Sequence, residues 1–77
     1  MNKERRKALD KANTLIQEAL DIIRDAQTEE QDAYDNMPES LQQSERGEKI
    51  YEYAEKLEEI ADTIESSNEE LMEIIEE

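Results

Sequence analysis

Small residues recur every seven positions in both halves of the chain. Alanine occupies four such positions in the first half, and one glycine and two alanines continue the interval in the second half. A seven-residue interval returns to the same face of an α-helix, and small side chains there let a neighbouring helix approach closely. The repeat therefore predicts two helices in close contact along a small-residue seam: Ala12, Ala19, Ala26, Ala33, Gly47, Ala54 and Ala61.

Larger apolar residues set the expected ranges of the two helices. Residues such as Ile16 and Ile23 alternate with the alanines in steps of three and four, which predicts a helix over about 3–35. The same spacing predicts a second helix over about 44–76, with Ser44 as its N-cap. Pro38 interrupts the pattern, because proline disfavours helical geometry in the residue before it. We therefore expect one all-α domain over 1–77, an antiparallel two-helix hairpin with a turn at about 36–43. Within this turn, Asn36 and Glu39 have the spacing of a capping box, which suggests a short helical turn.

The seam also predicts how the two helices align. If the numbers of facing residues add to 80, Ala26 meets Ala54 and Ile23 meets Leu57, so that small residues oppose small ones. The same rule lays three lysines beside three glutamates: Lys3, Lys7 and Lys11 beside Glu77, Glu73 and Glu69. Each group has the wrong charge for its own helix dipole, and we expect the pairing to relieve both.

The chain is short for a stable domain, which favours self-association. A core of 77 residues rarely supplies more than about 3–5 kcal/mol, and no cysteine or histidine is present for a disulfide or a zinc site. The seam leaves apolar residues on one flank of the hairpin: Leu15, Ile22, Tyr53, Ile60 and Ile74. We interpret this flank as the interface of a homodimer, which would be a four-helix bundle.

The residue types in this chain exclude several kinds of catalytic site. Without histidine or cysteine, neither a Ser-His-Asp triad nor a Cys-His pair can form within one chain. The Glu-x-x-His motif of ferritin-like di-iron bundles is missing, as are a phosphate-binding glycine-rich loop and an EF-hand. We expect no enzymatic activity, no cofactor and no metal site.

Acidic residues dominate the composition. The chain has 23 acidic and 9 basic residues, a net charge of −14, although residues 1–11 are net basic. Such a body repels nucleic acids and anionic membranes and attracts basic proteins. One row of carboxylates on the second helix has two interpretations, a solubilising surface or a mimic of nucleic acid phosphates. We call this row the acidic face: Glu52, Glu55, Glu59 and Asp62.

The turn carries the one resemblance to a known group of proteins. Residues 36–46 contain the pattern N-M-P-E-x-L-Q-x-S-E-R, and an acidic helix follows. This stretch resembles a recurrent group of small acidic proteins from phages and prophages. The resemblance implies a phage or mobile-element origin and supplies no site residues. No apolar run resembles a signal peptide or a membrane span, and we expect the cytoplasm of a bacterial host cell as the location.

Two hypotheses about function follow from these features. In the first, the protein is a non-catalytic, self-associating adaptor that binds an unidentified protein through apolar surface. In the second, it inhibits a host DNA- or RNA-binding or defence protein through the acidic face. Binding through many carboxylates weakens steeply with added salt, whereas apolar docking does not.

Overall fold

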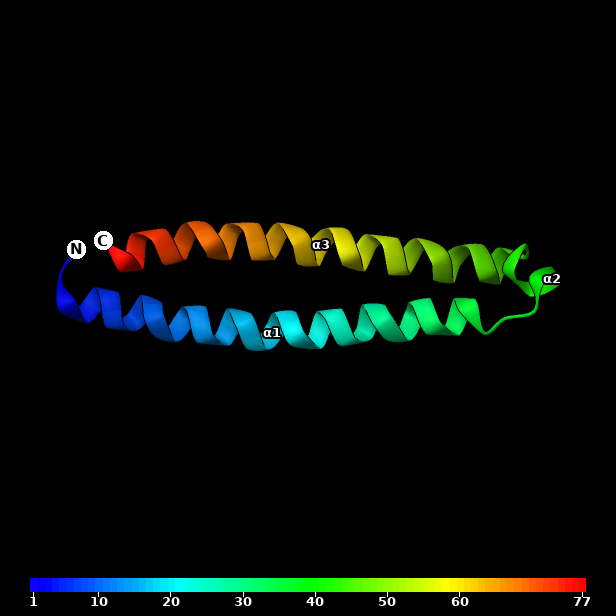
Figure 1. The fold of residues 1–77 in the computed structure, drawn as a ribbon, viewed down its shortest axis with the longest axis horizontal. Coiled ribbons are helices and arrows are strands. Elements are labelled where there is room, and N and C mark those ends of the chain that lie inside the picture. Colours follow the sequence, from blue (N-terminus) through cyan, green and yellow to red (C-terminus); the bar gives the residue numbers. More distant parts are fainter.

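The computed structural model describes residues 1–77 and consists of helices and their connections. The helices are α1 (Lys3–Asp35), α2 (Glu39–Gln42) and α3 (Glu45–Glu76). Figure 1 shows the two long helices side by side, with α2 at one end and both chain ends at the other. The result is a rod of 58 × 15 × 13 Å. The bounds of the two long helices differ by one residue at most from those expected.

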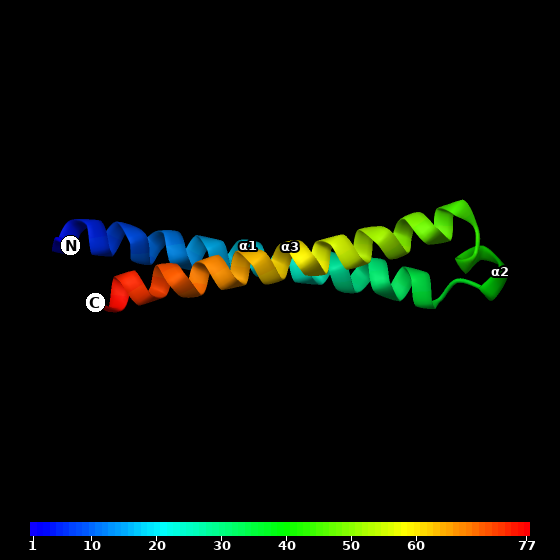
Figure 2. The same ribbon diagram turned by 90° about the horizontal axis from the view of Figure 1, so that it is seen from above.

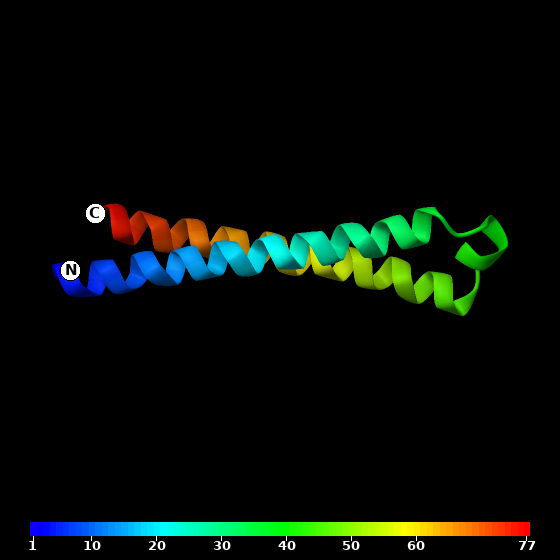
Figure 3. The same ribbon diagram turned by 90° about the horizontal axis from the view of Figure 1, so that it is seen from below.

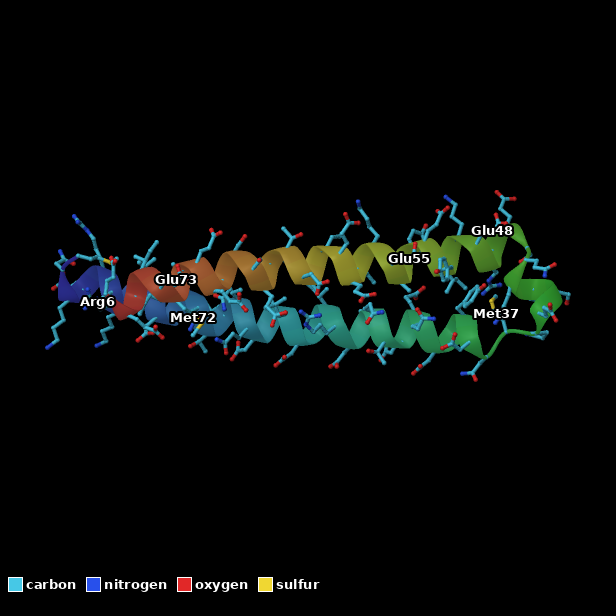
Figure 4. The ribbon with its side chains drawn as sticks, turned by 45° about the horizontal axis from the view of Figure 1, so that its top comes forward. Arg6, Met37, Glu48, Glu55, Met72 and Glu73 are labelled. Carbon is cyan, nitrogen blue, oxygen red and sulfur yellow. The ribbon has the colours of Figure 1, made fainter.

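The long helices cross at a shallow angle, as the views from above and below show (Figures 2 and 3). Near the α2 end lies the half-buried Met37, and near the opposite end lie Arg6 and Met72 (Figure 4). Side chains project along the whole length of both helices (Figure 4). The molecule is one layer of two helices, so each helix has only its inner face covered.

Polar side chains cap the starts of both long helices. Asn2 Oδ1 accepts the Arg5 amide at 2.8 Å, and Ser44 Oγ accepts the Gly47 amide at 3.2 Å. The expected capping box is wrong, because Pro38 is the N-cap of α2 and makes no side-chain cap hydrogen bond. Asn36 instead ends α1, where its backbone N–H donates to Asp32 at 3.0 Å.

The covered face of α3 follows the small-residue repeat. Ala54 and Ala61 are 1% and 0% exposed, and Gly47 is also buried. Seven residues after Ala61, Asn68 is 6% exposed. Ala54 and Ala61 allow α3 to approach α1 closely, whereas Gly47 lies against the backbone of α2.

On α1 the expected seam needs a correction of one residue. Ala19 and Ala33 are exposed, and Ala12 and Ala26 are only half-buried. The residues that face α3 lie one position later, and Leu20 is the one buried residue of α1. Two rows of α1 residues could face α3, the alanine row and the row with Leu20, because each lies beside Ile16 and Ile23. In the structure the row with Leu20 faces α3, and the burial of this leucine removes more apolar surface from water than burial of an alanine would. The inner row of α1 beside Ile16 and Ile23 is Asn13, Leu20, Gln27 and Tyr34.

The expected alignment of the two helices is also wrong. Arg24 Nη2 lies 3.5 Å from Asp62 Oδ1, and the rings of Tyr34 and Tyr51 are 5.2 Å apart between centroids. The numbers of these facing residues add to 86 and 85 instead of 80, a shift of more than one helical turn. The three ion pairs of the structure involve Arg24 and Lys56, and none involves the lysines of the first helical turns. Exposed ion pairs contribute only about 0–1 kcal/mol, too little to set the alignment against apolar burial.

Gly47→Ala should destabilise the protein although alanine is the better helix former. A Cβ on Gly47 would lie closer to the backbone of Leu41 and Gln42 than real Cβ atoms do, so the turn before α3 must shift. We expect a loss of about 1–3 kcal/mol by overpacking, measured by urea denaturation. Ser66→Ala, at an exposed site in the same helix, is the control and should be neutral or slightly stabilising. Equal stability of the two variants would contradict this account.

Candidate functional site

Large apolar side chains lie exposed on one flank of the helix pair. The exposed fractions are 56% for Leu15, 69% for Ile22, 54% for Tyr53, 40% for Ile60 and 47% for Ile74. These are the five residues that the sequence marks as an interface. The alanine row of α1, in which Ala19 and Ala33 are exposed and Ala12 and Ala26 half-buried, lies beside them. We call the whole set the apolar face: Ala12, Leu15, Ala19, Ile22, Ala26, Ala33, Tyr53, Ile60 and Ile74.

Both helices contribute to this one face. On α1, steps of three and four from Leu15 through Ala19 and Ile22 keep the side chains on one side of the helix. Across the helix pair, a hollow of about 340 Å³ is lined by residues that include Ala26 and Tyr53. A second hollow of about 230 Å³ lies beside Ile60, further along α3. The first hollow, which has residues of both helices in its lining, marks the side on which the α1 and α3 parts of the face meet.

Covering the apolar face would release considerable free energy. Each large apolar side chain that passes from water to a packed interior contributes about 1.5–3 kcal/mol. Contiguous apolar patches on soluble proteins commonly mark binding sites. The described helices include no third long element that covers this face.

The opposite flank is polar. Arg24 on α1 forms ion pairs with Glu65 and with Asp62 on α3, and these tie the two helices together. Beside Arg24 lies a groove of about 330 Å³, lined in part by Leu20 and Asn68. Asn68 Oδ1 is buried there without a hydrogen-bond partner. The polar flank therefore differs in chemistry from the apolar face.

Asn68 is a polar residue at a buried position of the seven-residue series. Its signal is a break in the seven-residue series, because Asn68 follows Ala54 and Ala61 at the position where another small apolar residue is expected. One polar residue in such a series specifies how helices pair, at a cost in stability.

The acidic face is exposed but partly paired. Glu52, Glu55, Glu59 and Asp62 all lie on the surface of α3. Asp62 pairs with Arg24, and Glu59 Oε2 lies 3.6 Å from Lys56 Nζ. Two of the four carboxylates are therefore partly neutralised, which leaves Glu52 and Glu55 without an ion pair.

Glu55 also affects a neighbouring tyrosine. Glu55 raises the pKa of Tyr51 above its ordinary value, as a hydrogen-bond acceptor for the protonated hydroxyl and through its negative charge. Minor contributions come from desolvation and from Tyr34. Tyr51 therefore keeps its proton at a pH where a free tyrosine begins to ionise.

The structure also bears on metals and membranes. No group of three or more acidic side chains has the geometry of a metal site. Neither long helix combines the length and the apolar character needed to cross a membrane.

No protein-family model, no curated protein and no solved structure matches this chain.

Proposed function

We propose that the protein acts without catalysis, by binding other protein chains, and that its first partner is a second copy of itself. In this proposal the chain folds as an antiparallel hairpin, and two hairpins stack their apolar faces to form a four-helix bundle. The assembled bundle then acts as an acidic adaptor for a further protein.

One observation carries the proposal, namely the exposure of five large apolar side chains on a single flank. Leu15 and Ile22 lie on one helix and Tyr53 and Ile60 on the other, each at least 40% exposed. A second copy offers the same face, and homo-oligomers with two-fold symmetry bring such a face against itself. The bundle would supply the apolar burial that a single two-helix layer lacks.

Ile22→Glu should convert the dimer to a monomer. A carboxylate at this site would have to be buried against apolar residues, which costs about 3 kcal/mol and raises the dissociation constant about 100-fold. Light scattering should give twice the chain mass of 9.0 kDa for the unmodified protein and 9.0 kDa for the variant.

Thr28→Glu is the matched control, because it adds the same charge to the same helix at an exposed site outside the apolar face. We expect it to stay dimeric. A mass of 9.0 kDa for the unmodified protein at high micromolar concentration would reject the proposal.

A second candidate function is inhibition of a basic nucleic-acid-binding protein by mimicry. It is supported by the exposed carboxylates of the acidic face along a 58 Å rod. Replacing Glu52, Glu55 and Glu59 by lysine should then abolish capture of a basic partner from bacterial lysate and leave helicity unchanged. Capture that survives both this reversal and high salt would reject mimicry.

The origin and location belong to the same proposal. The turn motif around Pro38 supports a phage or mobile-element protein that acts in the cytoplasm of a bacterial host. The net charge of −14 disfavours direct binding to nucleic acids or to anionic membranes. A further partner of the assembled dimer is an unidentified protein. Under the mimicry hypothesis, this protein has a basic surface.

A further inference from the structure

The contact between α1 and α3 is uneven along the rod. Four of the five buried residues lie between the middle of the rod and α2: Leu20, Gly47, Ala54 and Ala61. The side-chain hydrogen bonds and ion pairs that join the two long helices all involve Arg24, which lies in the same part. We call the remaining helical residues, 3–19 of α1 and 66–76 of α3, the terminal arms. They form the end of the rod opposite α2 (Figure 1).

The inner rows of the terminal arms are polar. Arg6 and Asn13 continue the row of Leu20 toward the N-terminus, and Asn68 follows Ala61 on α3. Asn68 is the one buried residue of the arms. Arg6 Nε and Asn68 Oδ1 are both buried without a hydrogen-bond partner. A buried polar atom that lacks a partner weakens the contact that buries it, so the arms gain less from pairing than the rest of the rod does.

Charges at the chain ends weaken the helices of the arms as well. Lys3 and Lys7 lie in the first two turns of α1, and Glu73 and Glu76 lie in the last two turns of α3. Cations at a helix N-terminus and carboxylates at a C-terminus oppose the helix dipole. None of the four takes part in an ion pair, so their attraction across the helix pair acts only at longer range. Each arm therefore ends in a destabilised helix terminus.

We infer that the terminal arms separate as one unit while residues 20–65 remain paired. Opening returns the unpaired oxygen of Asn68 to water, and it stops at Leu20 and at the ion pairs of Arg24. Proteins open locally in such cooperative units, and the segments with the fewest buried contacts open first. The separated arms expose Leu9 and Leu71, which are half-buried in the closed rod. This inference goes beyond the proposed function, because it concerns a motion within one chain.

Amide hydrogen exchange followed by NMR tests this opening. An arm without its neighbour is a short helix of marginal stability, so separation lets its amides exchange. Amides of one unit share one protection factor, and residues 12–16 and 69–72 should give a common value at least about tenfold below that of residues 23–32 and 54–61. Protection that rises gradually from each chain end, with no common value, would show ordinary fraying and overturn the inference. Equal protection in the arms and in the rest of the rod would also overturn it.

Asn68→Ala supplies a second measurement. Alanine completes the row of Ala54 and Ala61 and removes the unpaired oxygen, so we expect the arm amides to exchange about tenfold more slowly. The amides of residues 12–16 should slow by the same factor as those of residues 69–72, although the change lies on α3.

Ser67→Ala is the matched control, because it introduces the same side chain at the adjacent, exposed position of α3. Its higher helix propensity should slow exchange in α3 by no more than about two- to threefold and leave the α1 amides unchanged. Equal effects of the two variants on residues 12–16 would show that Asn68 does not weaken the contact between the arms, and would overturn the inference.

Discussion

Leu20→Ala is expected to unfold most of the chain at 25 °C. Leu20 is the one buried residue of α1 and is 7% exposed. Removing a buried leucine side chain costs about 2–5 kcal/mol, and a chain of this size has about 3–5 kcal/mol available. Circular dichroism at low micromolar concentration should show most of the helical signal lost.

Leu41→Ala is the matched control for this variant. It makes the same chemical change at a side chain that is 49% exposed in α2. We expect its unfolding temperature to remain within a few degrees of the unmodified protein, because a half-exposed side chain loses little burial. Similar losses in the two variants would show that Leu20 is not central to the contact between α1 and α3.

Ala61→Leu should destabilise the helix pair, whereas Ala19→Leu should not. Ala61 is 0% exposed against α1, so three added carbon atoms force the helices apart at a cost of about 1–3 kcal/mol. Ala19 points outward, and a leucine there meets only water in a single copy. Both changes are best made in the Ile22→Glu background, which removes any contribution from the proposed dimer, with stability measured by urea denaturation. Equal losses would mean that the alanine row of α1 does face α3.

The long helices were predictable because apolar residues recur at helical spacing on both sides of Pro38. On the α3 side the prediction from the small residues Ala54 and Ala61 was confirmed by their burial, although the row of Tyr53, Ile60 and Ile74 lies one residue earlier in the same helix. On α1, two rows share Ile16 and Ile23 and differ by one residue. Periodicity cannot choose between them, because both are consistent with the helical repeat. The choice depends on the larger burial available to Leu20.

The alignment of the helices was less predictable for a related reason. Facing alanines and complementary charges at the chain ends suggested a sum of 80, but these are weak determinants. Arg24 reaches Asp62 and Glu65 across the pair, and Tyr34 contacts Tyr51. Such contacts depend on side-chain reach in three dimensions and leave no periodic trace in the sequence. The five large residues of the apolar face were predictable, because they share one flank in either alignment, whereas its four alanines were expected on the seam.

Both chain ends lie at the end of the rod opposite α2 (Figure 1), and this has a mechanical consequence. A pulling force applied at residues 1 and 77 acts across the contact between α1 and α3 instead of along it. The two helices would then separate one helical turn at a time, starting beside Arg6 and moving toward α2. Each step breaks only a few side-chain contacts, so little force is needed. The same rod pulled from one chain end and from α2 would bear the load along its helix axes and resist far more strongly.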